Sequence, residues 1–190
     1  MPKKDFFDLD QALQHLKLLG YSEGDPVYLR FFYSSSDPRK NGDRGRKLTV
    51  PSGSELHRYQ REIEKLQAEG RGVYFVVNGG GHTDKDVTKA NAIFAEDDQR
   101  PKNEQNTRWR DLKLPEPTCQ VDTGGKSIHN YWGLAKSEVI ATWRPLQADL
   151  LDYVDGDRAI KNPSRVNATK LSAIAREKSP KVRSCLGFNR

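Results

Sequence analysis

The spacing of apolar positions predicts that helices and strands alternate in the first part of the chain. Leucines recur at helical spacing through residues 9–19, with a capping pattern at Asp8 before them and Gly20 after them. Residues 26–33 are β-branched and aromatic, which favours a strand. The polar run 34–47 that follows is expected to be a loop.

A second helix and a buried strand are predicted next. Ser52 and Glu55 form a capping box before apolar residues spaced three and four apart, and Gly70 marks the end of this helix. Residues 73–77 are apolar or aromatic, as in a buried strand. The glycine-rich segment 78–82 lacks the Lys-Ser/Thr pair of a phosphate-binding loop, and we interpret it as a tight connection.

The later part of the chain predicts three strands and a helix. Residues 92–98 form an apolar run that ends in three acids, and a polar, proline-bounded stretch follows. Strands over 119–123 and 126–134 are joined at two glycines, which favours a hairpin. Residues 137–153 have a helical pattern despite Pro145.

Two acids at the end of the 92–98 strand are candidate metal ligands. Residues i and i+2 of a strand share a face, so Glu96 and Asp98 are expected to lie side by side while Asp97 points away. Carboxylates this close repel each other unless a cation or a proton lies between them, and Mg²⁺ or Mn²⁺ suits oxygen ligands. The alternative is a solvated turn at the end of a strand.

A candidate phosphate site follows about thirty residues later. By the same alternation, Ser127, His129 and Tyr131 are expected to share one face, with Ile128 towards the core. Two glycines and Lys126 come just before them, and backbone amides, hydroxyls and cations are the groups that bind phosphate oxygens. A lone histidine lies more often in a core, which is the alternative for His129.

Length and composition allow one compact domain or two small lobes that share a cleft, because the chain has 190 residues of which 35% are hydrophobic. No apolar run approaches the length of a membrane helix, and we expect a soluble, cytoplasmic protein. Cys119 and Cys185 have neither metal-site nor disulfide spacing, so both are expected to be thiols.

Positive charge is concentrated in two segments. The net charge is +6, and residues 158–190 hold nine lysines and arginines against one acid. The loop at 34–47 adds five more basic residues, namely Arg39, Lys40, Arg44, Arg46 and Lys47. Such segments suit a polyanion, because lysine and arginine displace counterions from phosphates. A solvated terminus would have the same composition.

The order of these motifs resembles the archaeo-eukaryotic-type primase-polymerases, especially those encoded by plasmids, phages and other mobile elements. Glu96 and Asp98 correspond to the first motif, Ser127-Ile128-His129 to the second, and Asp157 to the third. The similarity extends to residues 73–78, 122–124 and 162–166. The resemblance implies an α+β fold of two αβ modules that face each other across a cleft, the second similar to an RNA-recognition motif.

The resemblance also implies a division of the chain and of its functional residues. Residues 1–166 would form the catalytic domain, and 167–190 a basic tail, an insertion or the start of a further region. The catalytic residues would be Glu96, Asp98, His129 and Asp157, of which the three acids would hold two Mg²⁺ or Mn²⁺ ions. The phosphates of an NTP or dNTP would contact Lys126, Ser127, His129 and Arg165.

The implied activity is DNA-templated nucleotide transfer that makes or extends primers. The basic loop and tail would follow a single-stranded DNA template, and a helicase module or protein is the implied partner. Two other functions suit the same residues. One is a non-catalytic replication-initiator or single-stranded-DNA-binding module, and the other is a metal-dependent nuclease.

Overall fold

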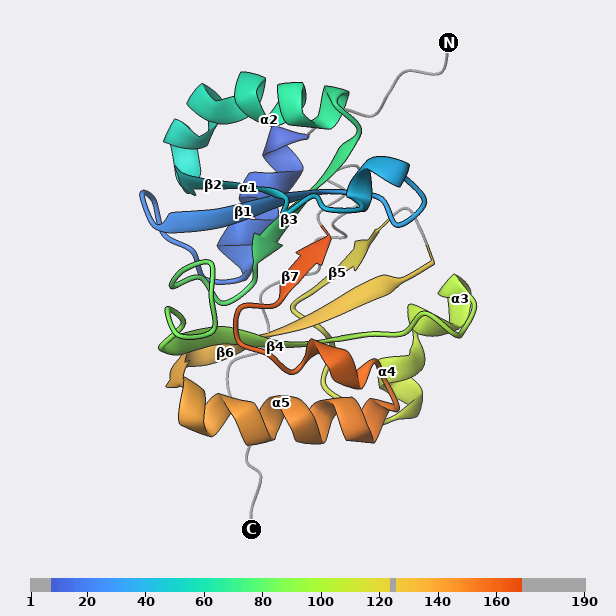
Figure 1. Ribbon diagram of the computed structural model, residues 1–190. Helices are drawn as coiled ribbons and strands as arrows, with labels where there is room; N and C mark the ends of the chain where they lie inside the picture. The colour runs from blue at the N-terminus through green and yellow to red at the C-terminus, as the bar shows by residue number, and fades with distance from the viewer. Residues whose placement is uncertain (1–7, 124–125, 169–190) are drawn as a thin grey trace.

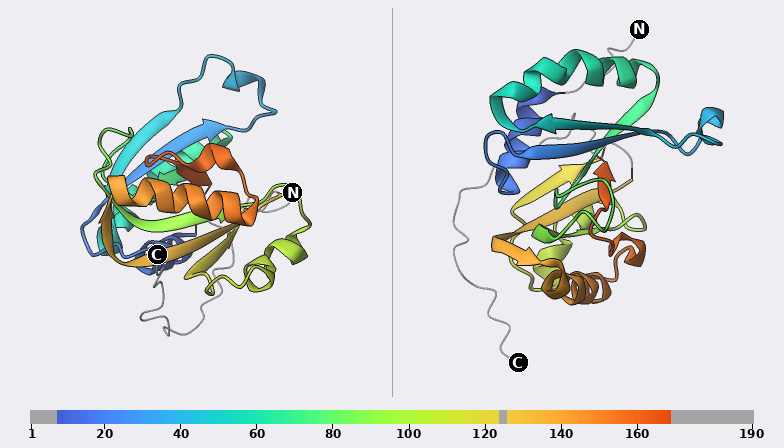
Figure 2. Two further views of the ribbon diagram at one scale, coloured as in Figure 1. Left: turned by 90° about the horizontal axis from the view of Figure 1, so that it is seen from below. Right: turned by 60° about the vertical axis from the view of Figure 1, so that its left-hand side comes forward.

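Two antiparallel sheets form the frame of the protein in the computed structural model, which describes residues 8–123 and 126–168 (Figure 1). The first sheet has the strand order β2-β1-β3-β7, and the second has the order β4-β6-β5. The helix α2 covers the first sheet and α5 covers the second, so the sheets are the inner layers (Figures 1 and 2).

The first sheet and its helices come mainly from the first part of the chain. In order, the elements are α1 (Leu9–Leu18), β1 (Pro26–Tyr33), the 3₁₀ helix η1 (Pro38–Lys40), β2 (Arg46–Pro51), the 3₁₀ helix η2 (Gly53–Tyr59), α2 (Gln60–Ala68) and β3 (Arg71–Val76). The predicted cap of α1 is confirmed, because the Asp8 carboxylate accepts hydrogen bonds from the backbone and the side chain of Gln11. Gly20 follows with a φ of 84°.

The second sheet comes from the later part of the chain. Its elements are β4 (Lys89–Glu96), α3 (Lys102–Gln105), α4 (Arg108–Asp111), β5 (Cys119–Asp122), β6 (Ile128–Val139), α5 (Ile140–Val154) and the 3₁₀ helix η3 (Arg158–Ile160). Strand, helices, two strands and helix follow one another as in a split βαβ motif. The next strand, β7 (Val166–Ala168), pairs with β3 of the first sheet. The predicted α+β class is confirmed, and β7 connects the two modules.

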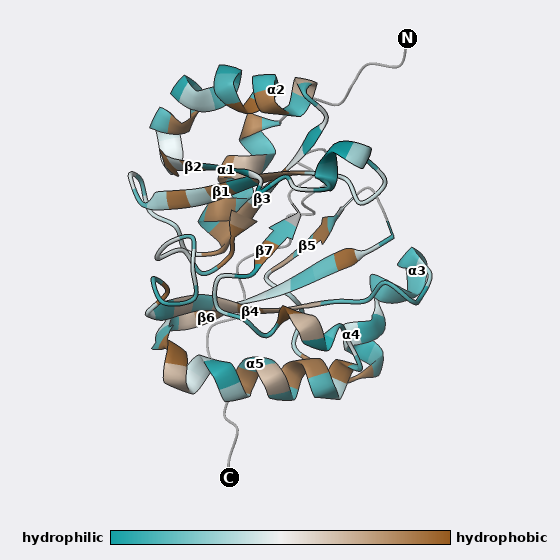
Figure 3. Ribbon diagram, in the orientation of Figure 1, coloured by the Kyte–Doolittle hydropathy of each residue, from teal (hydrophilic) through white to brown (hydrophobic). Residues whose placement is uncertain are grey.

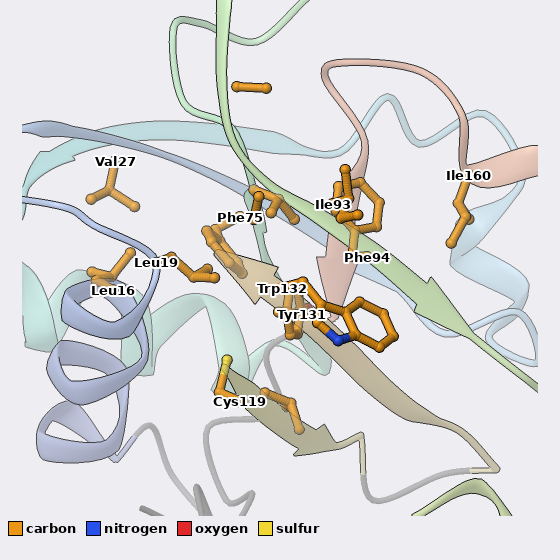
Figure 4. Close-up of a cluster of buried hydrophobic side chains, with 14 of the residues drawn as sticks. Leu16, Leu19, Val27, Phe75, Ile93, Phe94, Cys119, Tyr131, Trp132 and Ile160 are labelled. Atoms are coloured by element: carbon orange, nitrogen blue, oxygen red, sulfur yellow. The ribbon is translucent and has the colours of Figure 1, made fainter. Parts of the chain in front are cut away.

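One hydrophobic core spans both sheets. Side chains of α1, both sheets and η3 meet in it, as Figure 4 shows for Leu16, Phe75, Phe94, Tyr131 and Ile160. Apolar and polar positions alternate along α2 and α5 (Figure 3), as expected for helices that cover a sheet on one side. None of the helices in the described part of the chain is long and apolar enough to cross a membrane.

The structure corrects the prediction for the segment after β1. The expected loop ends early, because β2 begins at Arg46 and pairs with β1. Only Val50 of this strand is fully buried, so few positions of the strand need to be apolar and the sequence shows little alternation there. Ser52 does not cap a helix with its side chain. Its Oγ donates to the carbonyl of Ser22, and the 3₁₀ turns of η2 precede α2.

Strand boundaries in the second sheet also differ from those predicted. The strand expected over 92–98 ends at Glu96, so Asp98 lies just beyond it. The predicted hairpin is confirmed, since β5 and β6 pair in antiparallel register. However, β6 continues to Val139, and the last helix therefore begins only at Ile140.

His15 makes the stability of the fold depend on pH. Its side chain is 4% exposed, and its ring lies 5.2 Å from the ring of Phe75 and 5.0 Å from that of Tyr131. Burial, with a smaller effect of nearby His129, lowers the pKa of His15 from 6.5 to about 4. The unfolded chain therefore binds a proton between these two pH values that the folded protein does not bind.

Lowering the pH from 7 to 4 should consequently cost the wild type about 3 kcal/mol through His15, because the folded-state pKa is depressed. Over the same pH range, the free energy of unfolding of His15→Leu should fall by about 3 kcal/mol less than that of the wild type, because the variant lacks this group. Urea unfolding of both proteins at each pH measures the difference. A difference that does not change with pH would contradict this prediction.

Candidate active site

Glu96 and His129, chosen from the sequence as separate motifs, lie directly opposite each other. Glu96 is the last residue of β4, His129 is the second residue of β6, and the two are paired in the antiparallel register. Opposite residues of such a pair share a face. His129 Nε2 lies 2.5 Å from Glu96 Oε2, and the two side chains are 5% and 12% exposed.

A second contact, between Asp98 and Ser127, joins the same two motifs. Asp98 is exposed and lies outside β4, and its carboxylate accepts a hydrogen bond from the hydroxyl of Ser127. Asp97 points elsewhere, with its carboxylate 2.5 Å from the guanidinium of Arg100. Glu96 and Asp98 therefore each contact one residue of the second motif, although the strand that was expected to hold both ends at Glu96.

Arg165 reaches the same carboxylate from the segment that precedes β7. Its guanidinium lies 3.4 Å from Glu96 Oε1. The neighbouring Ser164 is held by Asp84, whose carboxylate accepts from the Ser164 backbone N–H at 3.0 Å and from its hydroxyl at 2.7 Å. Sequence reasoning missed Asp84, because nothing local indicates a contact between loops 80 residues apart.

The charge of Glu96 is favoured by its neighbours. Burial raises the pKa of this carboxyl group, but the hydrogen bond and charge of His129 and the charge of Arg165 outweigh that effect. The net result is a pKa below the usual value for glutamate. Glu96 is therefore an anion at neutral pH, held in place by two donors.

Tyr131 and Asn167 lie behind His129 and fix its tautomer. Asn167 Nδ2 donates to the Tyr131 hydroxyl at 3.2 Å, and this hydroxyl lies 3.4 Å from His129 Nδ1. Because Glu96 is an anion, Nε2 carries a proton and donates to its carboxylate. In the neutral ring Nδ1 then accepts from the Tyr131 hydroxyl. Tyr131 is fully buried, so it is not available to stack on a base.

Substitution of Tyr131 by Phe should remove the hydroxyl that interacts with His129 Nδ1. We expect the Nε2–H tautomer of His129 to lose population in Tyr131→Phe, and we expect the free energy of unfolding to fall by about 1–3 kcal/mol because Asn167 loses an acceptor. Long-range ¹H–¹⁵N spectra of the histidine ring report the tautomer. Tyr153→Phe, which removes an exposed hydroxyl that donates to the carbonyl of Leu112, is the control for the tautomer and should leave it unchanged. A wild-type spectrum with the proton on Nδ1 would contradict the assignment.

Asp157, the expected third acid, is close to Glu96 only through its backbone. Its N–H donates to the carbonyl of Glu96 at 3.4 Å, while its carboxylate accepts from the N–H of Ala159 at 2.8 Å and caps η3. Within residues 8–123 and 126–168, no group of three or more His, Cys, Asp or Glu side chains is placed to hold a metal ion.

The remaining expected residues lie at the surface. Lys126 is exposed in the turn before β6, and the two glycines that precede it fall outside the described residues, as does the basic tail from 169 onwards. The basic loop forms an arm between β1 and β2 that projects from the first sheet (Figure 2). Arg39 in this arm is paired with Asp37 at 2.7 Å. All five expected DNA-binding residues are exposed, and Arg46 and Lys47 lie at the start of β2 and not in the arm.

A small pocket lies on the opposite face of the second sheet. Its lining includes Glu96 but neither His129 nor Tyr131, and Ala95, Asn130 and Trp132, which also line it, alternate along their strands with these site residues. The candidate site is on the other face, where Tyr131 meets Asn167 of β7. The pocket is therefore not where Glu96 and His129 meet.

Comparison with known proteins identifies the family. A scan against protein-family models and a search of curated proteins both give no match. Among solved structures, the archaeo-eukaryotic primase domain of the primase-polymerase from cyanophage S-2L is 33% identical, with a TM-score of 0.72 over 85% of this chain and 81% of that one.

Two structures of the primase RepB′ share the fold at lower identity. One is 13% identical over 85% of this chain and 49% of its own, and the other, a catalytic domain in complex with initiator DNA, is 14% identical over 89% and 84%. Both have a TM-score of 0.58. With the fold, the paired motifs and the cyanophage similarity together, this chain belongs to the archaeo-eukaryotic primase-polymerases, which are DNA-templated nucleotidyltransferases.

Proposed function

We propose that this chain synthesises primers on single-stranded DNA and extends them, with Glu96, Asp98 and His129 at the reaction centre. The observation that supports this most is the pair of contacts Glu96–His129 and Asp98–Ser127, which unites two separate motifs on one face of the second sheet. The similarity to the cyanophage domain supports the same reaction class.

The residues of this face fit a divalent cation. Glu96 and Asp98 offer carboxylate oxygens, the ligands that Mg²⁺ and Mn²⁺ prefer, and Asp98 is exposed. Asp157 would join them only if its carboxylate left the N–H of Ala159. Bound ions would stabilise negative charge on the phosphates during transfer. A set of two ions remains a prediction from the resemblance.

The donors beside these acids suit an incoming nucleotide. His129 presents an N–H at Nε2, and Arg165 presents a guanidinium whose Nε has no hydrogen-bond partner among the described residues. N–H groups and guanidinium ions bind phosphate oxygens through charge-assisted hydrogen bonds. We infer that both move from Glu96 to the triphosphate when a nucleotide binds, with Ser127 and exposed Lys126 beside them.

Template-directed synthesis tests this proposal. The protein is incubated with a single-stranded template, NTPs and dNTPs, and Mg²⁺ or Mn²⁺, with and without an annealed primer. We expect labelled products that lengthen with release of pyrophosphate, and products without primer would demonstrate priming. The double variant Glu96→Ala/Asp98→Ala should make none, whereas Asp149→Asn, a change at an exposed carboxylate of α5, should synthesise normally.

The other candidate functions predict different results. A non-catalytic initiator or binding module would bind DNA equally well in the double variant and would synthesise nothing under any condition. A nuclease would release nucleotides instead of pyrophosphate. A cytoplasmic location, a helicase partner, an origin in a mobile element and the role of residues 167–190 stay predictions from the sequence.

A further inference from the structure

The first sheet has one face covered by α2 and one face that is open except at one end, where His82 contacts Tyr28 and Arg30. Over residues 27–32 of β1, fully buried residues alternate with the half-buried Tyr28, Arg30 and Phe32. The buried set packs in the core with Leu56 of η2 and Ile63 of α2. In the view from below, β1 and β2 extend past the second sheet with α2 behind them (Figure 2, left). We call Tyr28, Arg30, Phe32, Lys47 and Tyr74 the open face.

Strand register brings the open face together across three strands. Arg30 on β1 lies opposite Lys47 on β2 and opposite Tyr74 on β3. The Arg30 guanidinium is 5.1 Å from the ring centre of Phe32, and the rings of Phe32 and Tyr74 are 5.5 Å apart at 64°. Cations and aromatic rings are therefore interleaved on one surface. The solvated face of an antiparallel sheet is more commonly lined by polar residues.

The positive charge of the open face is not neutralised. Within the described part of the chain, neither Arg30 nor Lys47 pairs with a carboxylate, and Arg30 donates only to the backbone carbonyl of His82. The adjoining arm differs. There the Tyr33 ring lies between the guanidinium groups of Arg39 and Arg71, which are bound by Asp37 and Asp43 respectively. Arg30 and Lys47 thus place free positive charge on the open face.

The open face also leads to the candidate active site. Tyr74 is paired with Ala168 of β7, and Arg165, just before β7, contacts Glu96. A polymer lying on the open face would therefore pass close to the reacting groups. Free cations and half-buried aromatic rings together suit a single-stranded nucleic acid, whose bases stack on aromatic side chains while its phosphates bind cations.

We propose that the open face binds the single-stranded DNA template, with bases stacked on Phe32 and Tyr74 and phosphates bound by Arg30 and Lys47. The identity of the strand as the template rests on the proposed function. Binding of this kind does not read sequence, because every base has a ring face and every nucleotide has a phosphate. Exposed Lys40 and Arg44 of the basic arm would add phosphate contacts, whereas Arg39 would first have to leave Asp37.

Binding measurements without nucleotide and metal test the open face separately from catalysis. Fluorescence anisotropy with a labelled oligothymidylate of about 16 nucleotides gives Kd for the wild type and for variants. Tyr74→Ala should weaken binding about 5- to 100-fold, the effect of one lost stacking contact. Tyr74→Phe should bind within about twofold of the wild type, because the ring is kept. Tyr153→Ala, at a tyrosine 58% exposed on α5, should not change Kd.

A charge variant provides the second test. Lys47→Gln changes an exposed side chain and should leave the fold intact, which thermal unfolding verifies. We expect it to reduce the slope of log K against log salt by about 0.7, the value for one phosphate contact with a single strand. Equal Kd values for Tyr74→Ala and the wild type, with an unchanged salt slope for Lys47→Gln, would overturn the proposal.

The results separate this inference from the proposed function. Synthesis by the wild type, with binding unaffected in the variants, would overturn the open face alone. Binding that is weakened as expected, in a wild type that synthesises nothing, would support the open face and reject the polymerase reaction. Equal losses in Tyr74→Ala and Tyr153→Ala would also overturn the open face, because they would indicate a general effect on the protein.

Discussion

Replacing Glu96 by Gln should reduce nucleotide incorporation at least about a hundredfold, which corresponds to about 3 kcal/mol of transition-state stabilisation. The amide keeps the size of the side chain but loses the negative charge, and with it the ability to hold a cation. It also breaks the pairing with His129 and Arg165. Single-turnover extension of a primed template measures the loss.

The control for Glu96→Gln is Asp149→Asn, which removes the same charge from an exposed position on α5. We expect this control to extend primers at the wild-type rate. Binding of single-stranded DNA should be unchanged in both variants, because the open face is intact. Incorporation by Glu96→Gln within about threefold of the wild type would be incompatible with a role for this carboxylate in the reaction.

Replacing His129 by Ala should lower kcat/KM for the incoming nucleotide about 10- to 100-fold, the effect of one hydrogen bond to a charged group. Because the side chain is proposed to bind the triphosphate, most of the change should be in KM. The loss should be similar for NTPs and dNTPs, since both have the same phosphates. Steady-state extension over a range of nucleotide concentrations separates the two constants.

His57→Ala is the matched control for His129, because His57 is an exposed histidine on η2 in the first module. It should leave kcat and KM unchanged. A His129→Ala protein that keeps its KM and loses only kcat would show that the imidazole acts in the chemical step and not in nucleotide binding. Unchanged kinetics would return His129 to the alternative of an ordinary core histidine.

The sequence was most informative where alternation along a strand decides which side chains meet. Glu96 and His129 end up opposite each other because each occupies a defined position in a strand of period two. What alternation could not predict was the pairing of β4 with β6, since register between strands depends on contacts across the whole sheet. The position of Asp98 shows the same limit of prediction, because Asp98 contacts Ser127 from outside the strand that was expected to contain it.

Predictions failed where local pattern competes with distant contacts. The Ser52–Glu55 spacing is typical of a capping box, but the Ser52 hydroxyl finds the carbonyl of Ser22 instead. The strand at Arg46 was hidden because its charged residues belong to a sheet edge, where little side-chain surface is buried. Asp84 had no signal at all, since it acts on a loop far along the chain.

The return of β7 to the first sheet has a consequence for how the protein acquires its activity. The contacts of Glu96 with Arg165 and of Asp84 with Ser164 span 69 and 80 residues. Contacts of such long range form late, because closing a long loop costs entropy before any contact compensates for it. During synthesis on the ribosome, both sheets can therefore begin to form before Arg165 has emerged. The nascent chain would remain inactive until residues 164–168 take their place beside β3, so the closing step of folding is also the step that assembles the site.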